Sequence, residues 1–188
     1  MTRAPLVSDQ NLDPIAKEVI DRFAARNSAA PDLYRLLANA PELLKGWTDF
    51  AWALRESPRT DRGLRELLIM RTALLTGAEY EWAHHWAWAI DSGVTEAQLG
   101  ALAEWRAASC FSEAERTALA LNDAVVSGQG VPDEVFQAAQ VLFGPDQLIQ
   151  LTLTSAFYVC VARLLGAFEL PVEASHRDVP NMPQTSGT

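Results

Sequence analysis

The chain has 188 residues, of which 49% are hydrophobic, and it carries a formal net charge of −9. This size and composition suit one globular domain with a sizeable core. The acidic balance disfavours nucleic acid and anionic membrane surfaces as partners, although local arginines can still bind an acidic small molecule.

The cysteines and the N-terminus indicate the compartment. Cys110 and Cys160 are fifty residues apart and give no disulfide framework. The N-terminal stretch MTRAPLVSDQNLDP is polar and contains no hydrophobic signal segment. We therefore expect a cytoplasmic protein.

Prolines divide the first third of the chain into predicted helices. Each proline follows a break and is typical of a first helical position. Helices are predicted over residues 14–26, 31–37 and 41–55. The third has a wide apolar stripe that contains Trp47 and Phe50. These two side chains either line a binding pocket or belong to the ordinary core.

Residues 65–93, RELLIMRTALLTGAEYEWAHHWAWAIDSG, predict two helices joined near Gly77. On the first helix, Glu66 falls within the apolar stripe, which contains Ile69, Met70, Ala73 and Leu74. One interpretation is a carboxylate that loses water, so that its pKa rises unless another group pairs with it. The alternative is an ordinary glutamate near a helix N-terminus that reaches solvent.

The second helix of this pair has an apolar stripe and a polar face. The apolar stripe is Trp82, Trp86 and Ile90, and the opposite face holds Glu81, His84, His85 and Trp88. Glu81 and His85 are four residues apart, so the carboxylate can orient the imidazole as an acid–base pair. The alternative is a solvated polar face. Trp88 in its middle favours cover by a second helix or a neighbouring subunit.

Four further helices are predicted after this pair. They cover residues 95–106, 112–127, 132–143 and the long apolar run from Pro145 to about Leu170. The last approaches the length of a membrane span, but its polar residues favour a central buried helix. Within it, Cys160 is predicted to be an inert core residue, and Arg163 either pairs with a carboxylate such as Glu66 or caps the helix end.

The composition changes after Pro171. The stretch EASHRDVPNMPQTSGT is polar and rich in proline, which predicts disorder. We therefore expect a single domain over residues 1–172 and a disordered tail over 173–188. His176 lies in this tail and is not expected to be catalytic.

The central pair of helices resembles the carboxymuconolactone decarboxylase family, which includes the alkyl hydroperoxidase D-like proteins. The family pattern is a glutamate, a C-x-x-C that starts twelve residues later, and a histidine four residues after the second cysteine. Glu66 and His85 match the glutamate and the histidine, whereas Ala78 and Glu81 occupy the cysteine positions. Tyr80 begins the Tyr-Glu-Trp variant of non-redox members.

The resemblance covers roughly residues 30–172. It implies an all-α, single-domain bundle of about seven or eight helices that forms a homo-oligomer, often a trimer or a dimer of trimers. Because the motif has no sulfur, thiol chemistry is not expected. The leading hypothesis is a cofactor-independent lyase or isomerase, such as a carboxy-lyase, acting on a small carboxylated or lactone-like substrate. The alternatives are a peroxide-reducing protein and a non-catalytic binding or scaffold protein.

Under the leading hypothesis the catalytic residues are Glu66, Glu81 and His85. His85 is the general acid–base, Glu81 orients it, and Glu66 holds or shuttles a proton. The candidate substrate-binding residues are Tyr80, Trp82, His84, Trp47 and Phe50. We expect no metal, because there is neither H-E-x-x-H nor a cysteine cluster, and no nucleotide cofactor, because there is neither G-x-G-x-x-G nor a P-loop.

Overall fold

A computed structural model describes residues 2–184 of the chain. This part of the chain contains nine α-helices and no strand, which confirms the all-α prediction with slightly more helices than the seven or eight expected. The α-helices are α1 (Pro14–Ala24), α2 (Asp32–Leu37), α3 (Pro41–Glu56), α4 (Arg62–Thr76), α5 (Glu79–Asp91), α6 (Glu96–Ala101), α7 (Glu113–Ser127), α8 (Asp133–Leu142) and α9 (Pro145–Phe168). Short 3-10 helices are η1 (Asp9–Asn11), η2 (Leu102–Glu104) and η3 (Ala174–His176).

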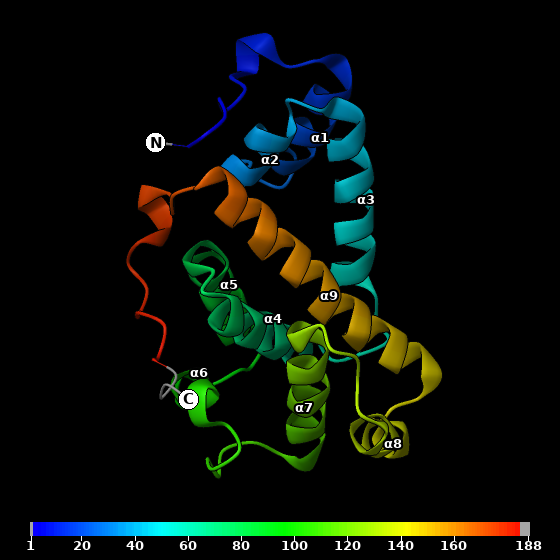
Figure 1. Cartoon of the computed structure of the whole chain (residues 1–188). Coiled ribbons are helices and arrows are strands. Elements are labelled where there is room, and N and C mark those ends of the chain that lie inside the picture. The colour runs from blue at the N-terminus through cyan, green and yellow to red at the C-terminus, as the bar shows by residue number, and fades with distance from the viewer. Residues whose placement is uncertain (1, 185–188) are drawn as a thin grey trace.

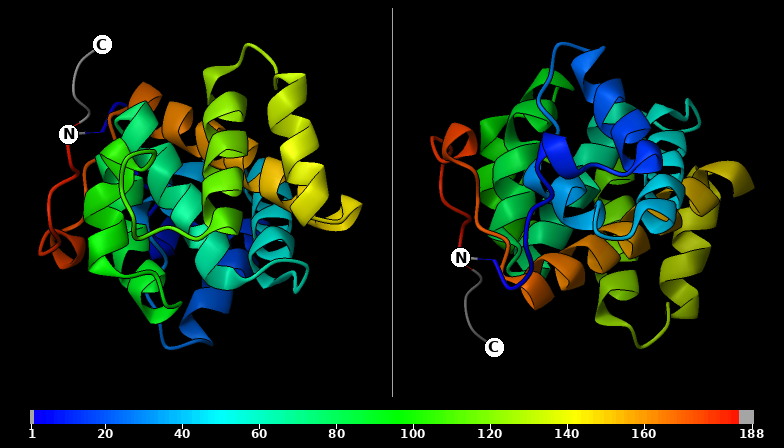
Figure 2. Two further views of the ribbon diagram at one scale, coloured as in Figure 1. Left: turned by 90° about the horizontal axis from the view of Figure 1, so that it is seen from below. Right: turned by 90° about the horizontal axis from the view of Figure 1, so that it is seen from above.

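Helix α4 lies at the centre of the bundle and packs against α5, α7 and α9 (Figure 1). Two apolar clusters adjoin it. One contains side chains of α4 to α9, and the other joins α1, α2 and α3 to the second half of α9. Figure 2 shows α7 and α8 as a pair at one side of the molecule. Burial on nearly every side explains why α4 carries its polar residues, including Glu66, into the interior.

Helix α9 has apolar residues on all of its sides and crosses the molecule beside α4 (Figure 1). Its length and composition would allow it to cross a membrane, but 56% of its apolar window is buried inside the fold. One side remains outside. Cys160 lies on that side, so the prediction of a core cysteine is wrong. Arg163 is also exposed there and does not pair with Glu66.

The segment after α9 differs from the expectation of disorder. Residues 173–184 run along the outside of α5 (Figure 1). Trp82 Nε1 donates a hydrogen bond to the carbonyl of Pro180 at 2.8 Å, and Val179 and Met182 pack against the core. These few apolar and prolyl residues are enough to cover α5, although the composition of the segment is polar. Residues 185–188 of the predicted tail lie outside the described residues.

Candidate functional site

The helical hairpin of α4 and α5 brings the motif glutamate to the motif histidine. Helix α4 ends at Gly77, whose φ of 68° is left-handed and suits glycine at a helix C-terminus. The chain then reverses into α5. As a result Glu66 Oε2 lies 2.7 Å from His85 Nδ1, with both side chains buried. The two residues are nineteen positions apart in the sequence, and the turn at Gly77 brings them together.

The environment fixes the protonation of this pair. Burial alone would raise the pKa of Glu66, but His85 and Arg62 outweigh it, so the pKa lies below its usual value. Burial lowers the pKa of His85, and the attraction of Glu66 only partly opposes this. The pair therefore holds a carboxylate and a neutral imidazole, whose Nδ1–H donates to Glu66. Nε2 is left with its lone pair and has no hydrogen-bond partner among the described residues.

Arg62 supports Glu66 from the solvent side. Its Nε and Nη2 donate to Glu66 Oε1 at 3.2 and 3.0 Å. The arginine lies one turn before the glutamate on α4, at a spacing that brings side chains into contact. Glu66 thus takes the role that the sequence assigned to Glu81, because it fixes the tautomer and orientation of His85.

Glu81 is buried, with 2% of its surface exposed, but it does not form the predicted pair with His85. Neither carboxyl oxygen has a hydrogen-bond partner within residues 2–184. Burial raises the pKa of Glu81 well above its usual value of 4.5, and Arg55 opposes this only in part. The surroundings of Glu81 therefore favour the neutral carboxylic acid, the form that can donate a proton.

Sequence reasoning missed three residues around this group: Arg55, Tyr158 and Arg62. Arg55 Nε donates to the Tyr158 hydroxyl at 3.1 Å, and the same phenol lies close enough to Glu66 and Glu81 for their carboxyl groups to influence its pKa. Burial raises the pKa of Tyr158, so it stays protonated. The i, i+4 spacing of Arg62 and Glu66 was a readable signal. Nothing in the apolar run of α9 marks Tyr158, and only the packing of α9 on α4 brings it here.

Access to the site is narrow. The rings of Trp88 and Tyr158 stand edge-on to His85 at 5.1 and 5.0 Å. Trp88 is 40% exposed, and the guanidinium carbons of Arg55 and Arg62 each lie 5.8 Å from its ring centroid. The cavity lined by these arginines, Glu66 and Tyr158 has a volume of about 10 Å³. It can hold about one water molecule, so a substrate requires Trp88 or Arg62 to move.

The remaining predicted residues of α5 face elsewhere, because α5 has three different faces. Tyr80 and His84 point towards the C-terminal segment, where both contact Glu173. These contacts outweigh burial and hold the pKa of Glu173 at about 2. Trp82 lies in the apolar cluster under Pro180. The structure therefore does not bring Tyr80, Trp82 or His84 to the Glu66–His85 pair.

Trp47 and Phe50 also lie apart from the pair. Both pack on Phe157 of α9, with ring centroids 4.8 and 5.3 Å away. Trp47 lies at the edge of the apolar core, which agrees with its interpretation as an ordinary core residue. Phe50 is 41% exposed and lines a surface groove between α3 and α9.

The fold belongs to a known architecture. The chain superposes on an alkylhydroperoxidase AhpD core, a peroxidase-related protein from Ralstonia eutropha, with a TM-score of 0.81, 16% identity and coverage of 96% of this chain and 98% of that one. A peroxidase-related protein from Silicibacter gives a TM-score of 0.78 at 15% identity, covering 94% and 93%. The debrominase Bmp8 in complex with 2,3,4-tribromopyrrole gives 0.76 at 19%, covering 94% and 96%. At these identities the likeness establishes the fold alone.

The sequence matches a family model over part of its length. Residues 41–124, from α3 into α7, match the model of the carboxymuconolactone decarboxylase family. This confirms the resemblance inferred from the spacing of Glu66 and His85. No curated protein matches the chain. The chain therefore resembles the carboxymuconolactone decarboxylase family over these residues and has the alkyl hydroperoxidase D-like fold.

Proposed function

We propose that this protein is a cofactor-independent lyase or isomerase that moves protons on a small carboxylated or lactone-like substrate. One observation carries the proposal: an imidazole oriented by a buried carboxylate and a second buried carboxyl group with a raised pKa, one helical turn away on α5, both lie near the Tyr158 ring. Such a pair supplies a base and an acid at the same pH. In this mechanism His85 Nε2 accepts a proton, Glu81 donates one, and Glu66 keeps the imidazole in the required tautomer.

The charges around the pocket favour an anionic substrate. Arg55 and Arg62 line the cavity and lie near Trp88, and of the two only Arg62 is paired with the Glu66 carboxylate. Arg55 contacts two phenols, those of Tyr158 and Tyr34, and is available for a substrate carboxylate. An arginine recognises a planar carboxylate with two hydrogen bonds. Carbanion formation next to such a group needs the stabilisation that these donors provide.

The test is solvent-deuterium exchange. A panel of small carboxylated lactones and their open-chain acids is incubated with the protein in D₂O and followed by proton NMR for deuterium uptake or loss of CO₂. His85→Gln, Glu66→Gln and Glu81→Gln should each lower the rate by about 10²-fold or more. Glu79→Gln, an exposed glutamate on α5, is the matched control and should retain the rate.

The pH profile gives a second readout on the same reaction. The rate should rise as His85 loses its proton, below the usual histidine value of 6.5, and fall where Glu81 ionises, well above 4.5. Glu81→Gln should remove the alkaline decline. The proposal would be contradicted if no compound of the panel were turned over. It would also be contradicted if His85→Gln, Glu66→Gln and Glu81→Gln were all as active as Glu79→Gln.

A binding or scaffold protein is the second candidate, and the small cavity favours it. A volume of about 10 Å³ leaves no room for a substrate unless side chains move. Under this candidate Glu66, Glu81 and His85 only set stability. Thiol-based peroxide reduction has less support, because Ala78 and Glu81 occupy the positions where the family motif has its cysteines. If the wild type reduces peroxide and Cys110→Ser/Cys160→Ser does not, thiol-based peroxide reduction would become the favoured function.

A further inference from the structure

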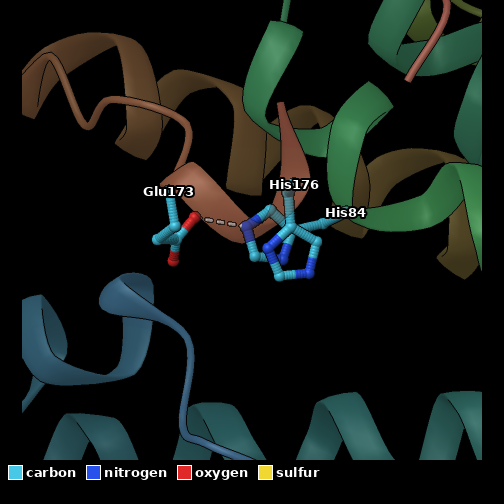
Figure 3. A group of neighbouring side chains, drawn as sticks. All are labelled: His84, Glu173 and His176. Atoms are coloured by element: carbon cyan, nitrogen blue, oxygen red, sulfur yellow. Dashed lines mark hydrogen bonds and ion pairs between the residues drawn. The ribbon is translucent and has the colours of Figure 1, made fainter. Parts of the chain in front are cut away.

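A second group of polar side chains lies on the outward face of α5, away from the Glu66–His85 pair. His84 of α5 meets Glu173 and His176 of the segment that follows α9 (Figure 3). One donor atom from each of the three residues lies within 4.8 Å of the other two. All three residues are half-buried, so the group is shielded but reachable from solvent.

The surroundings hold each of these donors in place. Glu173 Oε1 accepts hydrogen bonds from the Tyr80 hydroxyl at 2.7 Å and from the backbone N–H of Asp32 at 2.8 Å. Its other oxygen, Oε2, faces Nε2 of His84. Outer hydrogen bonds of this kind orient the ligands of a metal ion.

The two histidines are also fixed from outside. Tyr80 stacks on His84, with ring centroids 4.2 Å apart. His176 Nδ1 lies 3.0 Å from the Ser175 hydroxyl, which leaves Nε2 for a further partner. No other function described above uses this arrangement of two imidazoles and one carboxylate.

We propose that His84, Glu173 and His176 bind one divalent transition metal ion of the zinc type, and that the ion fastens the C-terminal segment to α5. Two imidazoles and a carboxylate are a zinc ligand set, with the fourth position open to water. The charge of the carboxylate favours a cation, and nearby Asp32 adds to it. This departs from the expectation of no metal, because two of the ligands come from a segment predicted to be disordered.

Metal binding requires one change of side-chain position. The rings of His84 and His176 are stacked, with centroids 3.8 Å apart and planes 17° from parallel. Stacked rings direct their lone pairs side by side, so the His176 ring must turn for both nitrogens to reach one ion. The ion also replaces the contact between His84 and Glu173. Loss of the stack on metal addition is therefore expected in the NMR signals of both rings.

The test is a metal titration of the full chain, free of any polyhistidine tag and treated with chelator beforehand. Calorimetry with Zn²⁺ and absorption with Co²⁺ should both show one ion per chain, and the Co²⁺ spectrum should be that of a tetrahedral site. His176→Ala and Glu173→Gln should each weaken binding by roughly tenfold or more. Glu79→Gln on the same helix is the control and should bind as the wild type does.

The segment itself gives an independent readout. Zn²⁺ should slow proteolytic cleavage within residues 177–184 of the wild type. The rate of cleavage of His176→Ala should be the same with and without Zn²⁺. His176 lies in a short surface helix, so this variant keeps the core intact. Stoichiometry below one, or equal affinity in His176→Ala and wild type, would overturn the proposal and leave a metal-free hydrogen-bonded contact.

Discussion

Glu66 and Glu81 are equally buried, each with 2% of its surface exposed, yet the pKa of Glu66 lies below its usual value and that of Glu81 lies well above it. Glu66 has an imidazole and a guanidinium within hydrogen-bond distance, and these stabilise the anion. Glu81 has only the field of Arg55, which does not offset the loss of water. Partners, rather than depth of burial, decide which carboxyl group ionises.

This difference predicts how stability depends on pH. Glu81 has a folded pKa above its unfolded value of 4.5, so its contribution is full below pH 4.5 and declines as pH rises towards the folded pKa. In Glu81→Gln this decline is absent. Between pH 4.5 and the folded pKa, the free energy of unfolding of the variant should therefore rise relative to that of the wild type by about 1.4 kcal/mol per pH unit.

Urea unfolding of both proteins at pH 5, 6 and 7 measures this gain. The exposed Glu79→Gln serves as the control and should run parallel to the wild type. A constant difference between Glu81→Gln and wild type over this range would show that Glu81 is ionised in the folded protein. The proton-donor role assigned to it would then be lost.

The sequence identified Glu66, Glu81 and His85 as candidates but not how they pair. Helical spacing brings Glu81 within reach of His85, yet side-chain direction within α5 leaves the two without a bond. The bond to Glu66 depends on how α4 crosses α5, and spacing within one helix carries no such information. Arg55 and Tyr158 were missed for the same reason, since both reach the site from other helices.

At the scale of helices, one glycine sets the distance between α4 and α5. A Cβ built on Gly63 would lie 2.6 Å from the carbonyl oxygen of Ser92, at the end of α5. The first turn of α4 therefore touches the last turn of α5 backbone to backbone. This contact, together with the turn at Gly77, fixes the crossing that brings Glu66 to His85.

We expect Gly63→Ala to destabilise the protein by about 1–3 kcal/mol, because one of the two helices must shift. Thermal or urea unfolding measures the change. Gly100→Ala is the matched control, since a Cβ added there would meet nothing within 4 Å and the residue sits in helix α6. The control should gain about 0.5–1 kcal/mol. Two variants of equal stability would contradict the close approach of α4 and α5.

Most helices could be predicted because their ends carry local signals. Asp13 accepts a hydrogen bond from the backbone at the start of α1, and Ser112 and Glu115 form the expected capping box of α7. Such signals depend on a few adjacent residues. The C-terminal segment shows where this fails, because its position depends on Trp82 and Tyr80, about a hundred residues earlier.

For the whole molecule, the exposed apolar side chains of α3 and α9 require an explanation. Phe50, Ile149 and Leu153 line a surface groove of about 400 Å³, and Ile149 is 61% exposed. Residues 149 and 153 are one helical turn apart and form a stripe. We propose that a second copy of the chain covers this groove in a homo-oligomer, either a trimer or a dimer of trimers.

Sedimentation or light scattering should therefore show a mass above the 20.6 kDa of one chain. The double variant Ile149→Glu/Leu153→Glu should shift the protein towards the monomer, because burying two carboxylates opposes association. Leu75→Glu changes an exposed leucine of α4 that does not line the groove, and it should leave the mass unchanged. A monomeric wild type would contradict the proposal.

The three faces of α5 have a consequence for insertions and deletions. Successive residues of a helix are turned by 100°, so one residue inserted between Glu81 and Trp82 would rotate all that follows by that angle. His84 would then face Glu66, and Ala83 would face Glu173. A deletion at the same point would turn His85 towards Glu173 and leave Trp86 opposite Glu66. Because the two histidines are adjacent, a shift of one residue within α5 decides which of the two sites keeps an imidazole.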